Sequence, residues 1–144
     1  MPSLWNLCQK GKLNEVRAAL ARGADVNSKY GQYNQTGLMA AVKNRQNSVV
    51  RLLLEQPTVD LNCTDFFRET ALHHAVTSDD AEIVQLLLND PRPNANYKDT
   101  IGDTPVMFAI KQKKVVALRE LVAHPIVDLD IMHHGMSVEE FAQR

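Results

Sequence analysis

Apolar residues recur at helical spacing along most of the chain. In the segment 81–90 (AEIVQLLLND) they lie one, three and four positions apart, at Ile83, Val84, Leu87 and Leu88. This spacing is typical of a helix that is buried along a broad stripe. The segment 70–78 (TALHHAVTS) shows the same spacing at Leu72, Ala75 and Val76, and a small alanine there would let two helices approach closely. The two segments are therefore predicted to form a pair of packed helices.

Polar and proline residues set the limits of these helices. Between the two segments, Asp79 or Asp80 supplies a side-chain oxygen that can cap the second helix, where the helix dipole favours an acidic residue. Prolines follow the second helices in the stretches EQPTVD, NDPRPN and AHPIVD, and they prevent the helices from continuing. The stretch DTIGDT, residues 99–104, is typical of a turn that leads into the next helix.

The same pattern repeats along the chain with a period of 34 residues. The repeated columns are Thr36, Thr70 and Thr104; Ala41, Ala75 and Ala109; and Leu53, Leu87 and Leu121. We expect one domain over residues 1–144, because each repeat can cover the apolar face of its neighbour. Its units are predicted at 2–35, 36–69, 70–103 and 104–136, followed by a partial unit at 137–144. The partial unit fits either a polar cap or the beginning of a longer array.

Short motifs point to a family. TALHHA and DTPVMFA are similar to the T-P-L-H-x-A motif of ankyrin repeats, and GADVN and TVDLN resemble the loop that follows the second helix. The resemblance covers residues 2–144 and implies an all-α repeat solenoid of stacked helix-turn-helix units with short β-hairpin-like fingers. It also implies structural roles for Thr36, Thr70, His73 and Thr104. The chain departs from the motif where Met39 and Met107 replace the histidine and where Arg68 replaces the turn glycine.

Composition limits the partners that the chain can have. A net charge of −1 creates no long-range field toward nucleic acid or an anionic membrane, so we expect neither as a partner. Two cysteines, Cys8 and Cys63, are too few for a dense disulfide framework, and we find neither a leader nor an apolar run long enough to cross a bilayer. We therefore expect a soluble, intracellular monomer that is located in the cytoplasm, with a nuclear location as the alternative.

Catalytic motifs are missing from the sequence. It has no G-x-S-x-G, no H-E-x-x-H and no glycine-rich phosphate loop, so we expect no enzyme, no catalytic residue and no cofactor. The resemblance implies that His73 bridges the repeat's threonine hydroxyl and nearby backbone, which favours a structural role over metal binding. His74, His133 and His134 are interpreted as variable or exposed positions, and the lone Cys8 as structural. A metal- or nucleotide-dependent enzyme is the alternative from another class.

Two adjacent phenylalanines indicate where a partner binds. Phe66 and Phe67 fall at the tip of a finger, in register with Thr100 and Ile101 in the next finger and with Tyr33 in the previous one. At least one phenylalanine should be exposed, because adjacent side chains in a tight tip point in different directions. Exposed aromatic residues are common binding hot spots. The alternative is that Phe67 and Ile101 pack between fingers.

The predicted function is therefore a protein-interaction module, an adaptor or scaffold. The resemblance implies that the partner lies on a concave face lined by fingers and first helices. A polar flank is predicted from the ends of the first helices: Lys43, Asn44, Thr77, Ser78, Lys111 and Gln112. The run Lys111 to Lys114 is interpreted as a solvated turn. A regulatory segment of a larger protein is the alternative within binding, and the resemblance marks Asn27 and Asn62 as possible hydroxylation sites.

Overall fold

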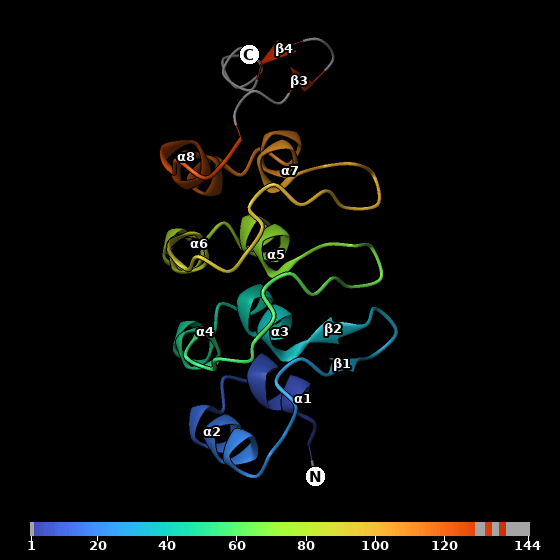
Figure 1. Cartoon of the computed structure of the whole chain (residues 1–144), viewed down its shortest axis with the longest axis vertical. Coiled ribbons are helices and arrows are strands. Elements are labelled where there is room, and N and C mark those ends of the chain that lie inside the picture. Colours follow the sequence, from blue (N-terminus) through green and yellow to red (C-terminus); the bar gives the residue numbers. More distant parts are fainter. Residues whose placement is uncertain (1, 129–131, 134–135, 138–144) are drawn as a thin grey trace.

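The computed structural model describes residues 2–128, 132–133 and 136–137, and nearly all of this part of the chain is helical pairs and connecting loops. The first helix of each pair is α1 (Leu4–Gln9), α3 (Gly37–Lys43), α5 (Ala71–Ser78) or α7 (Pro105–Lys111). The second helix is α2 (Leu13–Ala21), α4 (Asn47–Leu54), α6 (Ala81–Asn89) or α8 (Val115–Ala123). Figure 1 shows the pairs stacked along the long axis of the molecule, with first helices in one column and second helices in the other. The predicted repeat solenoid is confirmed.

Finger-like loops project from the column of first helices and connect consecutive pairs (Figure 1). The first finger is a short antiparallel ribbon of β1 (Lys29–Tyr30) and β2 (Gln35–Thr36). A second antiparallel ribbon joins β3 (Met132–His133) to β4 (Met136–Ser137). His134 lies outside the described residues, as does most of the predicted partial unit at 137–144.

Side-chain caps begin the helices at the repeated threonines. The hydroxyl oxygens of Thr36 and Thr104 accept hydrogen bonds from the backbone N–H groups three residues later, at 3.3 and 3.4 Å. Of the two aspartates considered for the next cap, Asp80 caps α6, since its carboxylate accepts from the N–H groups of Glu82 and Ile83. Such caps satisfy amide groups that the helix itself leaves without partners.

Asp79 has a different role from Asp80. It ends α5 in the left-handed region, with φ 53°, and its Oδ1 accepts a hydrogen bond at 2.8 Å from the N–H of Ala117 in α8. Arg45 and Lys113 occupy the same turn position with φ of 55° and 57°, and Gly11 does so with φ 70°. Three of the four turns therefore hold a residue that pays a conformational cost which glycine avoids.

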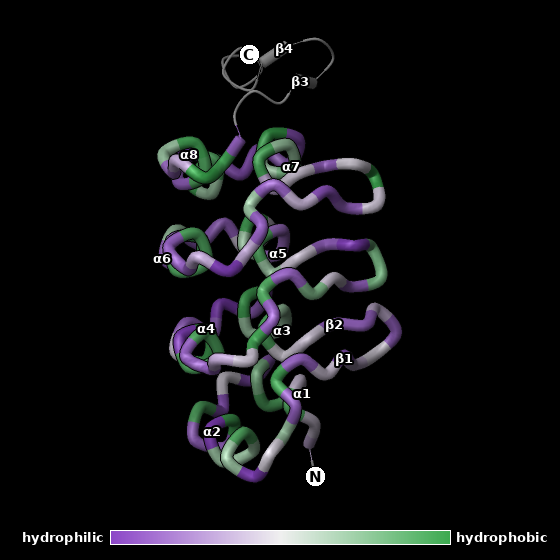
Figure 2. Tube along the Cα trace, viewed as in Figure 1, coloured by the Kyte–Doolittle hydropathy of each residue, from purple (hydrophilic) through white to green (hydrophobic). Residues whose placement is uncertain are grey.

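The repeated apolar columns form the core. Ala41, Ala75 and Ala109 are fully buried, and their small side chains lie on the first helices, which pack against one another along the stack. Leu53, Leu87 and Leu121 are equally buried on the second helices. Figure 2 shows the corresponding apolar positions along the helices, and also apolar residues at the outer ends of the second and third fingers. The apolar positions along the helices belong to the core, whereas the apolar residues at the ends of the fingers lie outside it.

Asparagines connect the loops on the other side of each unit. The amide of Asn27 donates to the carbonyl of Thr58 and accepts from the N–H of Asp60, both at 2.8 Å. Asn62 and Asn96 make the same pair of bonds to the following loop. Each amide thus links one unit to the next by a donated and an accepted hydrogen bond. Hydroxylation of Asn27 or Asn62 stays a prediction.

A close contact between α1 and α3 gives a first testable prediction. A Cβ at Gly37 would lie 2.9 Å from Sγ of Cys8, which is fully buried and has little room to move. We expect Gly37→Ala to destabilise the fold by about 1 kcal/mol, because the overpacking exceeds the gain in helix propensity. In Cys8→Ala the obstacle is gone, so the double variant should be more stable than the sum of the single effects predicts, by about 1 kcal/mol in urea denaturation. Additive effects would show that the sulfur is not what the new methyl group meets.

Candidate partner-binding surface

Buried aspartates hold the second and third fingers in shape. Oδ1 of Asp65 accepts hydrogen bonds from the N–H groups of Phe67 and Glu69, at 2.9 and 3.0 Å. Oδ1 of Asp99 accepts from the N–H groups of Ile101 and Asp103 with almost the same distances. Because each carboxylate closes its own turn, the tip of the finger is fixed before any partner arrives.

The turn after each tip needs a left-handed residue. Gly102 occupies this position in the third finger with φ 94°, whereas Arg68 adopts φ 60° in the second and Asn34 adopts φ 54° in the first. Asparagine tolerates this region better than arginine does. Arg68 is stabilised in place by a hydrogen bond of 3.3 Å to the hydroxyl of Tyr97, whose ring centroid lies 6.0 Å from the guanidinium carbon.

Backbone hydrogen bonds join the three tips to one another. The N–H of Phe66 donates to the carbonyl of Tyr33 at 2.8 Å, and the carbonyl of Phe67 accepts from both the N–H and the hydroxyl of Thr100, at 3.0 and 2.8 Å. Nζ of Lys29 adds a bond of 2.7 Å to the carbonyl of Thr64. The three fingers therefore form one connected edge.

This edge carries a set of exposed apolar side chains that we call the finger-tip patch. Its members and their exposed fractions are Tyr33 44%, Phe66 67%, Phe67 47% and Ile101 80%. The Phe67 ring lies between two neighbours, with its centroid 5.6 Å from that of Tyr33 and 5.2 Å from that of Phe66, the latter in a T-shaped arrangement. Phe67 thus packs on the neighbouring finger and is still about half exposed, whereas Ile101, at 80% exposed, is not buried between fingers as the alternative expectation held. Both phenylalanines are exposed, and Thr100 lies exposed beside them.

The predicted polar flank is exposed at five of its six positions. Ser78 differs from the rest because it is buried and its hydroxyl donates a hydrogen bond of 2.8 Å to the carbonyl of Val42 in the preceding unit. Thr77 donates to the carbonyl of His73, and Lys111 forms an ion pair with Asp103 at 2.8 Å. Lys43, Asn44 and Gln112 are exposed at the same end of the first helices. Ser78 therefore serves contact between units and does not belong to the exposed flank.

His73 is fully buried, and both of its ring nitrogens make hydrogen bonds. Nδ1 lies 3.2 Å from the backbone nitrogen of Thr70 and accepts its hydrogen, which places the ring proton on Nε2. Nε2 then donates to the carbonyl of Asp103 in the next finger, at 2.9 Å. The ring also meets Phe108 edge-on at 5.7 Å. Burial is the main reason that the pKa of His73 is lowered, and the neutral ring joins two units.

His74 is also buried, which the sequence did not indicate. Its Nε2 lies 2.9 Å from Oδ2 of Asp65, and Glu69 is close by, so that possible ligand atoms of the three side chains lie within 4.8 Å of one another. Burial acts to raise the pKa of Asp65, but hydrogen bonds from His74 and from the N–H groups of Glu69 and Phe67 outweigh it and hold the pKa below its usual range. The carboxylate therefore supports the finger, and the contact was hard to foresee because it arises where the finger folds back on α5.

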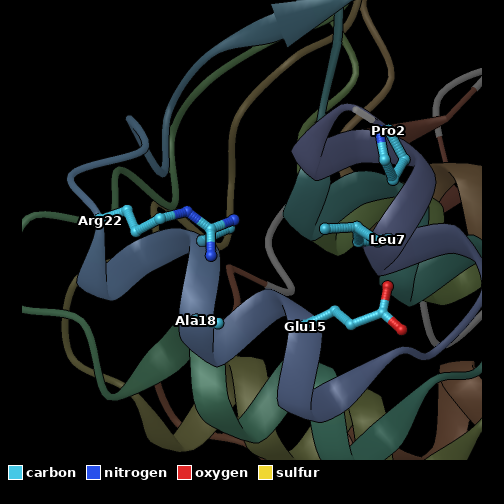
Figure 3. A pocket seen from close by; sticks show the side chains of 6 residues that line it. Pro2, Leu7, Glu15, Ala18 and Arg22 are labelled. Atoms are coloured by element: carbon cyan, nitrogen blue, oxygen red, sulfur yellow. The ribbon is translucent and has the colours of Figure 1, made fainter.

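Cys8 is a buried thiol, and two hollows lie between helices. Burial raises the pKa of Cys8 to about 12, so its thiol is protonated at neutral pH. A hollow of about 250 Å³ lies between α1 and α2, with Glu15 and Arg22 on different sides of it (Figure 3). Another of about 240 Å³ lies between α6 and α8. The residues lining these two hollows include one arginine and no lysine, a weak setting for a nucleotide phosphate.

Among the described residues, no helix combines the length and apolar character needed to cross a bilayer.

A search of curated protein sequences found no match. The family model described as "Ankyrin repeats (3 copies)" matches residues 4–99, which span α1 to the third finger. The geometry of α7 and α8 continues the same stack beyond that match. Since the match covers more than half of the sequence, the chain belongs to the ankyrin repeat family.

Proposed function

We propose that this chain is a non-enzymatic protein-interaction module, an adaptor or scaffold, whose partner lies on the finger-tip patch and on the exposed ends of the first helices. Ankyrin repeats generally mediate protein–protein interactions, and they are typically non-catalytic. The observation that carries the proposal is the exposed patch itself, Tyr33, Phe66, Phe67 and Ile101 on one connected edge. The monomeric state and intracellular location expected from composition belong to the same proposal.

The energetics of the patch favour binding. Covering apolar surface releases about 25 cal/mol for each Å² removed from water, and aromatic side chains offer large areas for few rotatable bonds. The turns closed by Asp65 and Asp99 are already fixed, so a partner does not have to order the fingers. A small number of large, preorganised side chains is the usual composition of an interface hot spot.

Affinity capture from a cell lysate tests the site. We expect Phe66→Ser with Phe67→Ser to abolish capture of the specific partners, with a loss of affinity of about ten-fold or more, because two hot-spot rings are removed. Both side chains are largely exposed, so the variant should melt within a few degrees of the wild type by circular dichroism.

Val115→Ser with Val116→Ser is the matched control. These valines are an adjacent, exposed apolar pair on α8, away from the fingers, with exposed fractions of 61% and 37%. The control should capture the same proteins as the wild type. If the phenylalanine variant also captures an unchanged set, the fingers are not the binding site and the proposal fails.

A further inference from the structure

Charges are separated between the two sides of the stack. We define the finger side as residues 28–45, 62–79 and 96–113, which hold the fingers, three first helices and the turns that follow them. Every lysine and arginine on this side is exposed: Lys29, Lys43, Arg45, Arg68, Lys98, Lys111 and Lys113. Every acidic residue on it is buried or half-buried: Asp65, Glu69, Asp79, Asp99 and Asp103. The surface that the finger side offers to solvent is therefore basic.

The acidic residues point inward because they hold the fold together. Asp65 and Asp99 close the finger turns, Asp79 caps α8 through the N–H of Ala117, and Asp103 pairs with Lys111. These carboxylates face hydrogen-bond donors or Lys111 within the chain, whereas the seven exposed cations outnumber the five acidic residues of the finger side.

Glu69 is the remaining acidic side chain of the finger side. Burial raises its pKa, and the carboxylates of Asp65 and Asp99 act in the same direction against the opposing effect of His74 and Lys43. Glu69 is half-buried, so it is less exposed to solvent than the lysines and arginines of the same side.

The outer side, residues 13–27, 46–61, 80–95 and 114–128, has the opposite balance. It holds nine acidic and six basic residues, so the net charge of −1 for the whole chain conceals a basic face and an acidic one. Some of the outer charges are paired with each other, as in Arg51 with Glu82 and Arg92 with Asp90. The near-neutral composition, taken alone, hides this arrangement.

Exposed basic side chains lie on the same fingers as the finger-tip patch and on the first helices that follow. Arg68 directly follows Phe67 and is held beside Tyr97, and Lys98 lies in the next finger, three residues before Ile101. Lys43 lies in the last turn of α3 and is itself part of the polar flank. An apolar patch with exposed cations on the same side of the stack favours a ligand that combines apolar anchors with negative charges.

We propose that the partner presents an acidic peptide segment, with Asp or Glu residues flanking one or more large apolar side chains that seat on the finger-tip patch. The inference rests on the proposed function and specifies the chemistry of the partner. Nucleic acid is the less favoured occupant, because the exposed centre includes the aliphatic Ile101 and the rings of Phe66 and Phe67 meet edge to face, which gives successive bases no flat platform.

A random peptide library displayed on phage and selected on the immobilised chain provides the probe. We expect enriched peptides to combine acidic residues with Phe, Leu or Trp. The affinity of a selected peptide, measured by fluorescence polarisation, should fall about ten-fold between about 0.05 M and about 0.3 M salt because salt screens exposed charges. The same peptide with Asn and Gln in place of Asp and Glu should bind about ten-fold more weakly.

Two double variants test which side of the stack carries the basic side chains that bind the acidic peptide. The finger-side variant Lys43→Gln with Lys98→Gln should lower the affinity for the acidic peptide about three- to ten-fold. The variant Arg17→Gln with Arg119→Gln, on the outer helices, should leave that affinity within about two-fold of the wild-type value. Circular dichroism melting of both double variants confirms that they fold alike.

The remaining outcomes separate this inference from the proposed function. If selection returns no peptide, the proposed acidic chemistry of the partner is overturned. If it returns neutral or basic peptides, that chemistry is also overturned, but the finger site stands when the variant Phe66→Ser with Phe67→Ser no longer binds those peptides. If no selected peptide is lost with the phenylalanine variant, the finger site itself fails. A single-stranded oligonucleotide that binds more tightly than the acidic peptide, and is lost with the lysine variant, would overturn the inference in favour of nucleic acid.

Discussion

Replacing His73 by methionine should destabilise the protein by about 2–4 kcal/mol at pH 7.5, because a buried amide and a buried carbonyl both lose their partner. The affected groups are the N–H of Thr70 and the carbonyl of Asp103, and the Thr70 hydroxyl, 3.0 Å from Nδ1, is affected as well. Methionine itself fits this environment, since Met39 is buried at the equivalent position of the preceding unit. The loss therefore reports the hydrogen bonds and not the volume of the side chain. Urea denaturation followed by circular dichroism measures it.

The effect of His73→Met should also depend on pH. The folded-state pKa of His73 is lowered from its ordinary value of 6.5, mainly by burial, so the unfolded chain binds a proton more readily than the folded one. Wild-type stability is then fully present above pH 6.5 and declines as the pH falls through 6.5 toward the folded-state pKa. The variant lacks this response, so the difference between the two proteins should shrink by up to about 1 kcal/mol between pH 7.5 and pH 5.5.

His73→Gln is the matched control for this prediction. Glutamine at the same helix position can accept from the N–H of Thr70 as in a capping box, but it does not titrate. It should recover part of the lost stability and show the flat pH response of the methionine variant. If the glutamine and methionine variants keep the wild-type pH response, the proton is taken up elsewhere and the role assigned to His73 is wrong.

The elements that the sequence predicted well are those fixed by neighbours in the chain. The threonine caps and the apolar stripe of α6 depend on residues within about one helical turn, and the 34-residue period repeats them in the same register. The period also placed Tyr33, Phe67 and Ile101 at equivalent tips, each directly before a residue with positive φ.

The features that the sequence left hidden depend on contacts between units. Ser78 is buried because the carbonyl of Val42 lies across the stack, 36 positions earlier. Arg92 lies between two prolines in the loop after α6, and its guanidinium donates to the carbonyls of Leu54 and Gln56 at the end of α4, at 2.7 and 3.0 Å. A periodic sequence indicates which elements are neighbours, but it does not say which polar side chains reach across.

The charge asymmetry was hidden for a related reason. Sequence counts treat Asp65 and Lys98 as equal and opposite, although the first is buried in a turn and the second is exposed. The turn composition did contain a signal, since an aspartate whose oxygen can close the following turn is engaged by the backbone. Such aspartates are turned inward, so the seven basic residues of the finger side face solvent while its five acidic residues do not face it fully.

Leu87→Ala should destabilise the protein by about 3 kcal/mol, since the lost transfer free energy adds to the cost of the cavity left behind. Leu87 is 1% exposed on α6, which packs against α4 on one side and α8 on the other. In a stack whose units contact only their neighbours, a defect in such a helix weakens both interfaces at once. Thermal or urea unfolding followed by circular dichroism gives the free energy of unfolding.

Leu86→Ala is the control that makes Leu87→Ala a test of register. It removes the same atoms from the adjacent position of the same helix, where the side chain is only half-buried. Helix propensity changes equally in the two variants, so the difference between them isolates burial. We expect Leu86→Ala to cost about 1 kcal/mol. Equal losses, or a larger loss at Leu86, would mean that α6 is rotated about its axis from the orientation described here. The alignment of Leu53, Leu87 and Leu121 as one buried column would then be wrong, and so would the 34-residue register that places the finger-tip residues side by side.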